Sequence, residues 1–374
     1  MLAGIDPWIG GEVKDYGRLM KEFGIAPFAP FLKRLPKPHL LMRRGIVFGQ
    51  VDYGPVAERL RRRQGMVMLT GLMPSGKFHL GHKLLADQMV FYQQHGARLV
   101  IVVADVEAYH MRLASLPDLR KIAIEEYLLN YIALGLKPTG CEIYFQSARS
   151  PAGDKANAYH RLAALAARKT TMNELQAIYG ELTPGKLTSV LHQVADILHP
   201  MLPEFHGKVP VVVPVGADQS PHLRFARDVA SRFTKSGEYD FLPPASTYHT
   251  FLPGLKGGKM SSSDPLSYIA LTDTPAQAKE KVMKHAFSGG RGSVQEHREK
   301  GGVPEVDVAF QILRYGMEPD DRALRQVEEE YRSGRLLTGE LKQLVCERLA
   351  AFLQDHQDKR EQARDQLGKF LPGV

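Results

Sequence analysis

Short apolar runs that alternate with helical patterns constrain the fold of this chain more than any other feature of its sequence. The clearest run is residues 98–104 (RLVIVVA), whose β-branched side chains are typical of a strand buried on both faces. Similar runs occupy residues 66–70, 142–145 and 209–215. Helical spacing lies between and after them, at residues 80–94, 119–134, 157–180, 187–198 and 221–233. This alternation predicts an α/β fold built on a doubly wound parallel sheet.

The same pattern divides the 374 residues into three regions. Residues 1–64 are punctuated by proline and glycine, with one helical stretch at Tyr16–Phe23, and we expect an N-terminal extension laid against a larger body. Residues 65–273 are expected to form the Rossmann-like sheet domain with a helical insertion. Beyond Asp273 the strand pattern stops, which predicts an all-helical C-terminal domain over residues 274–374.

Composition excludes several classes of protein. No apolar stretch approaches the ~18–20 residues that a membrane-spanning helix needs. The first residues, MLAGIDPWIGGEVKDYG, lack the basic and apolar regions of a secretion signal, so we expect a cytoplasmic protein. Cys141 and Cys346 cannot build a disulfide framework, and neither has the neighbouring ligands of a cysteine-rich zinc site. We therefore expect no metal held by the protein itself.

The formal net charge of +8 is concentrated in one segment. Between residues 33 and 63, only Asp52 and Glu58 oppose nine basic side chains, namely Lys33, Arg34, Lys37, Arg43, Arg44, Arg59, Arg61, Arg62 and Arg63. Such a segment can face the phosphates of a nucleic acid. It can equally be a solvated face whose counter-charges come from elsewhere in the folded chain. The charge count leaves both interpretations open.

In a doubly wound sheet, ligands bind outside the carboxyl ends of the strands, where the strand order reverses. The loops to inspect therefore follow Thr70, Ala104, Phe145 and Val215. The first loop, residues 70–82, reads TGLMPSGKFHLGH. Its stretch from Gly71 to Lys77 has the spacing of a phosphate-binding P-loop, but Phe78 replaces the Ser or Thr that would bind magnesium.

Two histidines, His79 and His82, open the helix that follows this loop. Their spacing places both imidazoles on one helical face at its positive end, where phosphates are favoured. Gly81 removes a side chain between them, so a flat base can approach the backbone closely. The alternative is a helix start that contains histidine without any functional reason.

A second polar motif, residues 257–263 (GGKMSSS), lies in a glycine-rich loop just before the helical C-terminal region. Lys259 supplies a point charge for phosphate oxygens. The serines that follow, Ser261, Ser262 and Ser263, supply hydroxyl donors. A flexible polar linker would have similar glycines and serines, but it would not explain the lysine and methionine at the join.

The pair HLGH and KMSSS resembles the HIGH and KMSKS signatures of the class I aminoacyl-tRNA synthetases. Within that class, the resemblance is to the tryptophanyl enzymes of archaeal and eukaryotic type, and it covers nearly the whole chain. It is carried by Asp6-Pro7-Trp8, Asp15-Tyr16 and Phe23-Gly24 near the N-terminus, by Val215-Gly216-Ala217-Asp218-Gln219, which is similar to a GxDQ motif, and by the segments KHAFSGGR, EHR and GG between Lys284 and Gly302.

The chain departs from the pattern of that family in three places. Ser262 replaces the second lysine of KMSKS, so Lys259 carries the positive charge of the loop alone. Leu69 and Val102 stand where eukaryotic-type enzymes have a tyrosine and a glutamine that contact the indole. Asp196, in the stretch QVADIL, resembles the bacterial aspartate that accepts the indole N–H, but archaeal tyrosyl enzymes also have an aspartate there.

The resemblance implies roles for the residues of both motifs. His79 and His82 would serve the triphosphate of ATP, and Lys259 with its three following serines would close on the leaving pyrophosphate. Four further residues would contribute to ATP binding: Gly71, Gly81, Asp218 and Met260. Magnesium would arrive with ATP, because the family has no fixed protein cage for it.

For the amino acid, four polar residues are the candidates that the resemblance implies: Glu107, Gln193, Asp196 and Gln219. Asp196 lies in an apolar stretch, where a carboxylate without a partner would cost several kcal/mol, so we expect it to have one. The resemblance further implies a tRNA partner, anticodon recognition by the C-terminal helices and a homodimer. We expect the basic segment, residues 33–63, to help bring the acceptor end of the tRNA to the active site.

Three rival interpretations stay open at the level of sequence. A tyrosyl-tRNA synthetase is the nearest, because residues 70–110 resemble archaeal tyrosyl enzymes at least as well. A P-loop NTPase is a rival on the glycine spacing from Gly71 to Lys77. An RNA-binding protein that kept a degenerate nucleotide fold is the non-enzymatic alternative, although the intact HLGH and KMSSS motifs argue against it.

Overall fold

A seven-stranded sheet forms the centre of the molecule. The computed structural model describes residues 15–112, 114–258, 260 and 264–371. The strands are β1 (Ala26–Pro27), β2 (Val47–Val51), β3 (Val67–Leu72), β4 (Arg98–Val103), β5 (Cys141–Phe145), β6 (Val211–Gly216) and β7 (Ala245–His249), in the spatial order β1-β2-β7-β6-β3-β4-β5. The five strands from β7 to β5 run parallel, and β2 and β1 extend the sheet antiparallel at one edge. The predicted doubly wound α/β fold is confirmed.

The strand order reverses at β3, which has β4 on one side and β6 on the other. The carboxyl end of β3, where the HLGH loop begins, is therefore the place at which such a sheet binds its ligands.

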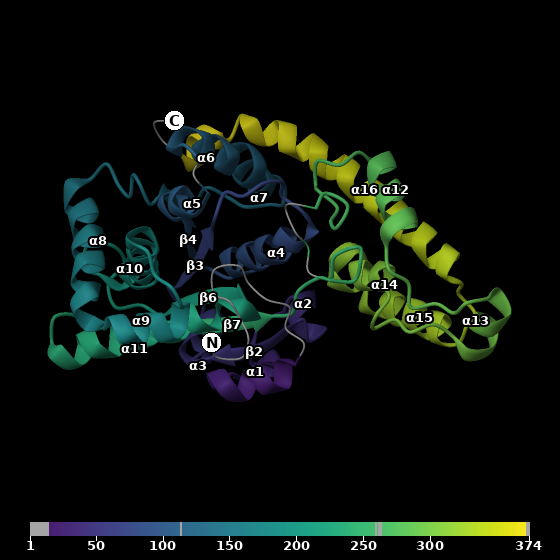
Figure 1. Cartoon of the computed structure of the whole chain (residues 1–374), viewed down its shortest axis with the longest axis horizontal. Helices are drawn as coiled ribbons and strands as arrows, with labels where there is room; N and C mark the ends of the chain where they lie inside the picture. The colour runs from purple at the N-terminus through teal and green to yellow at the C-terminus, as the bar shows by residue number, and fades with distance from the viewer. Residues whose placement is uncertain (1–14, 113, 259, 261–263, 372–374) are drawn as a thin grey trace.

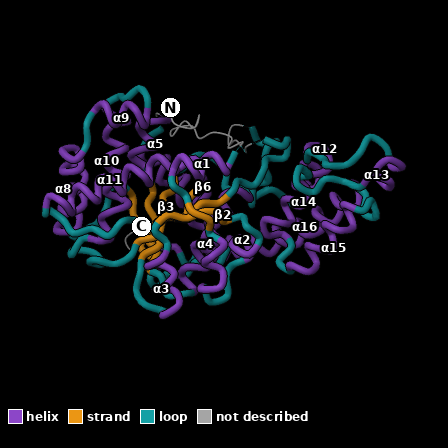
Figure 2. Tube along the Cα trace, turned by 90° about the horizontal axis from the view of Figure 1, so that it is seen from below, coloured by secondary structure: helices purple, strands orange, loops and turns teal. Residues whose placement is uncertain are grey.

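Helices cover both faces and both ends of this sheet (Figures 1 and 2). In the N-terminal half they are α1 (Tyr16–Phe23), η2 (Ala29–Arg34), α2 (Leu40–Arg43), α3 (Gly54–Arg62), α4 (Leu80–Gln94), α5 (Asp105–Arg112), α6 (Leu116–Ile122), η3 (Ala123–Leu128), α7 (Leu129–Ala133), α8 (Gly153–Ala166), η4 (Ala167–Lys169) and α9 (Met172–Tyr179). The rest are α10 (Pro184–Leu198), η5 (His199–Met201), η6 (Ala217–Gln219), α11 (Ser220–Ser236), α12 (Pro275–His285), α13 (Val294–Lys300), α14 (Val308–Ile312), η7 (Leu313–Met317), α15 (Asp321–Arg332), α16 (Thr338–Arg364) and α17 (Leu367–Phe370).

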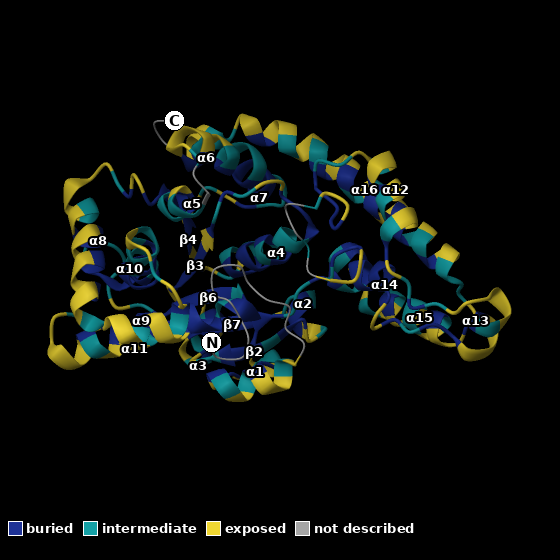
Figure 3. Cartoon of the chain, viewed as in Figure 1, coloured by how far each residue is buried: buried dark blue, intermediate teal, exposed yellow. Residues whose placement is uncertain are grey.

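Two hydrophobic clusters hold these layers together. One contains Leu69, Val102 and Tyr144 and packs the sheet against α8, α10 and α11. The other lies on the opposite face and extends from Phe28 in the N-terminal extension to Leu353 in α16, so it includes residues of all three regions of the sequence. Figure 3 shows the sheet as the buried centre, with exposed residues on the outer faces of the helices.

Three strands, β1, β2 and β7, were not predicted from the sequence, and neither were the helices α2, α3 and α5. β2 has a glycine at its middle, because a Cβ at Gly49 would lie 2.4 Å from Cγ2 of Ile25. β7 reads ASTYH, yet all its residues are buried, since it lies between β2 and β6. Neither strand has the β-branched apolar run that identified β4. The extension is thus part of the sheet, as well as resting against it.

The C-terminal helices return to the sheet domain through α16 (Figure 1). His356 Nε2 lies 2.7 Å from Oδ1 of Asn130 in α7, and Gln357 donates to the carbonyls of Leu271 and Asp273. The helices α13, α14 and α15 lie at one end of the molecule and α8 to α11 at the other. Among the residues that the structure describes, no helix combines the length and the apolar run needed to cross a membrane.

The basic segment, residues 33–63, is divided by the fold. Arg43 and Arg44 both pair with Asp321 of α15, at 2.8 Å, and Arg61 and Arg62 pair with Glu58. Arg61 to Arg63 end α3 immediately before β3 begins, so they lie at the amino end of that strand. The expected ligand site is at its carboxyl end, so these arginines lie at the opposite end of β3 from it, and their role toward the acceptor end of a tRNA stays a prediction.

Candidate active site

The start of α4, directly after the loop that follows β3, is capped by the two histidines of the HLGH motif. His79 is the N-cap of α4, and its Nδ1 accepts from the backbone N–H of Gly81 at 3.1 Å. In return, Nδ1 of His82 accepts from the backbone N–H of His79 at 3.2 Å. The two imidazole centroids are 3.9 Å apart. The predicted pair therefore meets on one helical face, and it satisfies two of the free N–H groups at the helix start.

This capping fixes the protonation of both rings. Because each Nδ1 accepts a hydrogen bond, the proton of each neutral imidazole is on Nε2. Burial lowers the pKa of His82 to about 4, and burial together with the neighbouring His82 lowers the pKa of His79 well below its usual value. At neutral pH the two rings therefore offer Nε2–H donors at the positive end of α4 without carrying a charge of their own.

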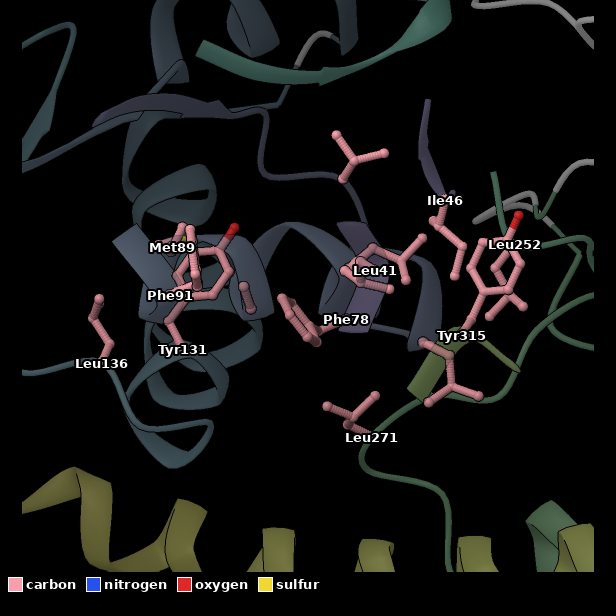
Figure 4. Close-up of a cluster of buried hydrophobic side chains, with 14 of the residues drawn as sticks. Leu41, Ile46, Phe78, Met89, Phe91, Tyr131, Leu136, Leu252, Leu271 and Tyr315 are labelled. Carbon is pink, nitrogen blue, oxygen red and sulfur yellow. The ribbon is translucent and has the colours of Figure 1, made fainter. Parts of the chain in front are cut away.

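The residues before His79 do not support a phosphate-binding P-loop. Phe78, in the place of the metal-binding Ser or Thr, is fully buried in the cluster that Figure 4 shows, with Tyr131, Leu41 and Leu271. Lys77 pairs with Glu126 of η3, with Nζ 2.8 Å from the carboxylate. The phenylalanine is required by the core, so its presence in the motif has a structural reason.

Met260 of the KMSSS motif and the segment that follows the motif lie against the start of α4. A Cβ at Gly81 would be 2.9 Å from Cε1 of His79 and 3.3 Å from the sulfur of Met260, so the absent side chain leaves room for protein atoms from both motifs. Farther along, Leu80 donates to the carbonyl of Ile269, and the Tyr268 ring lies 5.0 Å from that of His79. The two motifs, far apart in the sequence, are neighbours.

Four of the predicted site residues lie outside the part of the chain that the structure describes: Lys259, Ser261, Ser262 and Ser263. The Asp6-Pro7-Trp8 segment lies outside it as well. Gly71 is exposed near the end of β3, where an added Cβ would meet nothing within 4 Å.

The GxDQ-like motif follows directly after β6. Asp218 is buried in η6, and Gln219 lies at the start of α11. A Cβ at Gly216 would lie 2.9 Å from Oδ1 of Asp218 and 2.6 Å from the Phe251 ring, so this glycine allows the carboxylate to lie against the end of the strand. The motif is therefore at the carboxyl edge of the sheet, on the other side of the switch point from β4.

Asp196 has three partners from the chain itself. Oδ1 accepts from the hydroxyls of Tyr144 and Tyr159, both at 2.7 Å, and Oδ2 accepts from Nε2 of Gln146 at 2.7 Å. Burial raises the pKa of Asp196, while these three hydrogen bonds act in the opposite direction. A carboxylate has about four acceptor positions, so one remains open on Oδ2.

Glu107 is the second carboxylate of this region. It lies in the first turn of α5, after β4, and its backbone N–H donates to Oε1 of Gln146 at 3.3 Å. Burial, with a smaller contribution from the negative charge of Asp196, raises the pKa of Glu107 to about 7. Gln193 is half-buried one turn before Asp196 on α10. Three of the four predicted amino-acid ligands thus belong to one region behind β4 and β5.

The sequence did not identify Tyr144, Gln146 or Tyr159 as site residues. Tyr144 lies beside Val102 in the register of β4 and β5, so it is adjacent to the position where the indole-contacting glutamine of the eukaryotic type is missing. Tyr144 and Gln146 are two residues apart at the end of a buried strand, and this period-2 pair of polar side chains was the signal that could have revealed them.

No group of three or more His, Cys, Asp or Glu residues in the described part of the chain is arranged to hold a metal ion.

The comparisons with known proteins agree with the geometry of this site. Residues 61–354 match the family model described as "tRNA synthetases class I (W and Y)". A tryptophan–tRNA ligase of Aeropyrum pernix is 46% identical over 371 residues, covering 98% of this chain and 97% of the relative, and one of Methanocaldococcus jannaschii is 40% identical over 377 residues, covering 100% and 99%. The chain belongs to the archaeal-type tryptophanyl-tRNA synthetases of class I.

Solved structures support the same family. The crystal structure of the tryptophanyl-tRNA synthetase from Aeropyrum pernix matches with a TM-score of 0.89 and 45% identity, over 98% of each chain. A class I synthetase of this family needs its two signature motifs at one ATP site, and here Met260 of the second motif contacts the Gly81 position of the first. Family membership decides against the P-loop NTPase and the degenerate RNA-binding protein.

Proposed function

We infer that this chain is a tryptophan–tRNA ligase. It joins tryptophan to ATP to give tryptophanyl-adenylate and pyrophosphate, and it then transfers the tryptophanyl group to the 3′ end of its tRNA. The observation that carries this inference is the match over nearly the full chain to curated tryptophan–tRNA ligases, at 46% and 40% identity. The contact between the HLGH and KMSSS segments at the switch point of the sheet supports it.

The first step requires positioning more than proton transfer. A carboxylate oxygen of tryptophan attacks the α-phosphorus of ATP, and the bond from that phosphorus to the pyrophosphate oxygen breaks. Since the nucleophile is already ionised, no base is needed, and the protein must orient the two substrates and stabilise the charge that gathers on the leaving pyrophosphate. In the second step a ribose hydroxyl of the tRNA attacks the carbonyl carbon, and AMP leaves.

We propose that the phosphates bind at the start of α4. His79 and His82 donate from Nε2 there, in addition to the positive end of the helix dipole. Lys259 and the serines that follow it close on the pyrophosphate as a loop that completes the site. Gly71 and Asp218 flank the ATP at the ends of β3 and β6. Magnesium accompanies ATP as the counter-ion of its phosphates, which is its usual mode in ATP-dependent enzymes.

We propose that tryptophan lies between the ends of β4 and β6. Glu107, Gln193 and Gln219 hold its amino and carboxyl groups, and the open acceptor position on Asp196 takes the indole N–H. A site built to bind a polar hydrogen of its substrate rejects an analogue that lacks it by ~10⁴–10⁵-fold. Phenylalanine is excluded on this ground.

Three further features of the proposal come from the resemblance. The enzyme is a cytoplasmic homodimer. Residues 1–64, 65–273 and 274–374 form the extension, the catalytic domain and the anticodon-binding domain. Size-exclusion chromatography with light scattering tests the dimer, which has twice the 41.7 kDa mass of the chain.

Charging of tRNA tests the function as a whole. Purified enzyme with ATP, magnesium and total archaeal tRNA should form tryptophanyl-tRNA from labelled tryptophan and no tyrosyl-tRNA from labelled tyrosine. Lys259→Ala should reduce charging strongly, while Lys208→Ala, at an exposed lysine before β6, should leave it unchanged. Charging with tyrosine and none with tryptophan would make the enzyme a tyrosyl-tRNA synthetase.

A further inference from the structure

A buried arginine, Arg149, contacts two of the residues that hold Asp196 in place. Arg149 follows β5 and is 3% exposed. Its guanidinium is held between two aromatic rings, 3.9 Å from the centroid of Tyr144 and 4.5 Å from that of Phe205. Nη1 donates to Oε1 of Glu142 at 2.7 Å, and Nη2 donates to Nε2 of His199 at 2.8 Å. Arginine cannot release its proton, so a full positive charge is buried here.

Arg149 contacts both structures that hold Asp196. On one side it stacks on Tyr144, whose hydroxyl donates to Oδ1 of Asp196. On the other side it fixes His199, because accepting from Arg149 leaves the proton of that imidazole on Nδ1. Nδ1 of His199 then donates to the carbonyls of Ala195 and Asp196, both at 3.0 Å. The side chain and the backbone of residue 196 are thus both tied to one guanidinium.

The arrangement is costly for stability alone. The guanidinium must leave water almost completely, with its side chain 1% exposed, while its carboxylate partner Glu142 stays 35% exposed, so the desolvation of the arginine is repaid only in part by the ion pair. A planar cation that stacks and donates in two directions is, however, well suited to fixing geometry. The positive charge also acts to lower the pKa of Tyr144, against the stronger effect of burial, and so makes its hydroxyl a better donor to Asp196.

We infer that Arg149 is a positioning residue for the recognition of tryptophan. It acts through Tyr144 and His199 to hold the Asp196 carboxylate in one orientation, with its last acceptor position directed at the indole N–H. This inference rests on the proposed function. Leu69 and Val102 stand at the positions of indole-contacting polar residues in eukaryotic-type enzymes, but in this chain both are apolar and buried. Asp196 is therefore the residue that would accept a hydrogen bond from the indole N–H.

The test compares tryptophan with 3-benzothienylalanine, which has the same shape and no N–H. The quantity measured is the ratio of kcat/KM for the two substrates in amino-acid-dependent ATP–pyrophosphate exchange. Arg149→Met should reduce this ratio about tenfold, as expected for the loss of one hydrogen bond to a charged acceptor. Arg149→Lys, which keeps the charge but lacks the planar guanidinium that stacks on Tyr144 and donates in two directions, should give an intermediate ratio. The KM for ATP should stay within about twofold for both variants.

Arg44→Met is the matched control, because Arg44 is also an arginine with a largely buried side chain, 6% exposed, and it lies in a network far from Asp196. It should leave the substrate ratio unchanged. If Arg149→Met does not fold, Arg149→Lys and Phe205→Leu, which removes one stacking ring, decide the question. A folded Arg149 variant that loses activity equally on both substrates would overturn the inference and leave Arg149 a structural residue. A wild-type enzyme that does not activate tryptophan would instead overturn the proposed function, before any variant is compared.

Discussion

The two histidines of the HLGH motif have a structural task in capping α4, and we propose a chemical one for the same rings. Each ring uses Nδ1 to cap α4, and the same hydrogen bond leaves Nε2–H for a ligand. The spacing of the motif predicted a shared face. The reciprocal capping could not be predicted, because histidine is not among the usual N-cap residues.

The first prediction concerns the pH dependence of stability. The pKa of His82 is about 4 in the folded chain and near 6.5 when unfolded, so the unfolded state binds more protons between these values. The contribution of His82 to stability is complete above pH 6.5 and is lost as the pH falls toward 4. In His82→Gln, the glutamine can still cap the helix but does not titrate. Urea unfolding from pH 7.5 to 5 should therefore show a shallower slope of the free energy against pH for the variant, and identical slopes would contradict this account.

The second prediction concerns Glu107 and the binding of tryptophan. Burial and Asp196 raise the pKa of Glu107 to about 7, and only the ionised form can pair with the ammonium group of the amino acid. kcat/KM for tryptophan should therefore rise through pH 7, by nearly tenfold per unit on the acid side. In Glu107→Gln it should be lower, and flat across that range. ATP–pyrophosphate exchange from pH 5.5 to 8.5 measures both, with the KM for ATP as the control, and the same profile in the two enzymes would exclude Glu107 from this role.

The residue that sequence reasoning assessed best is Asp196. An aspartate in an apolar stretch had to have a partner, and the structure supplies three from the chain. Those partners are 37 to 52 residues away in the sequence, on strand β5, in the turn directly after it and on helix α8. Only the register of β5 beside β4 and the packing of α8 on α10 bring them together, so no local pattern could have identified them.

At the scale of elements, the buried parallel strands were the easiest part to predict. β3, β4, β5 and β6 are close to their predicted bounds, because strands covered on both faces are apolar throughout. β7 was missed since its Ser246 and Thr247 are polar, although both are fully buried. β2 was missed because Gly49 interrupts it to make room for Ile25. Both depend on contacts with distant segments, which single-sequence patterns do not contain.

The third prediction concerns the junction of β3 and α4. In Gly81→Ala, the new methyl group would clash with the ring of His79 at 2.9 Å and touch Met260 at 3.3 Å. Alanine favours a helix by about 1 kcal/mol over glycine, and this gain offsets the cost of the clash. The free energy of unfolding should therefore change little. The displaced ring and second motif should raise the KM for ATP about tenfold or more, while the KM for tryptophan should change less. Gly153→Ala, with no atom near an added Cβ, is the control.

An unchanged KM for ATP in Gly81→Ala would mean that the two motifs do not need this close contact during the reaction.

At the scale of the whole molecule, Arg44 is one of the side chains that join the extension to the C-terminal helices. Arg44 donates to Asp321 at 2.8 Å, to the carbonyl of Arg314 at 2.8 Å and to that of Glu318 at 2.7 Å. It therefore satisfies carbonyls at the end of η7, where a cation is also favoured by the helix dipole. The side chain is 6% exposed.

The fourth prediction follows from this junction. Arg44→Met should lower the free energy of unfolding by about 2 kcal/mol, because the carbonyls of Arg314 and Glu318 lose a charged donor and Asp321 loses one of its two arginines. Arg61→Met, at an exposed arginine that pairs with Glu58 of its own helix, should leave that energy nearly unchanged. Urea unfolding of the two variants measures the difference, and equal effects would show that Arg44 does not hold the two regions together.

The net charge shows where sequence reasoning about the whole molecule reaches its limit. The nine basic residues between positions 33 and 63 form one cluster in the sequence. In the fold, two of them join distant helices, and another group lies at the opposite end of β3 from the ligand site. The charge count could not separate these cases, since counter-charges such as Asp321 are almost 280 residues away.

The central claim is that this site activates tryptophan. ATP–pyrophosphate exchange tests it most directly, measured with tryptophan, with tyrosine and without any amino acid. We predict exchange that depends on tryptophan, is negligible with tyrosine, and falls strongly in Asp196→Ala through a loss of kcat/KM for tryptophan. Exchange with tyrosine and none with tryptophan would contradict the account, as would release of phosphate from ATP without an amino acid.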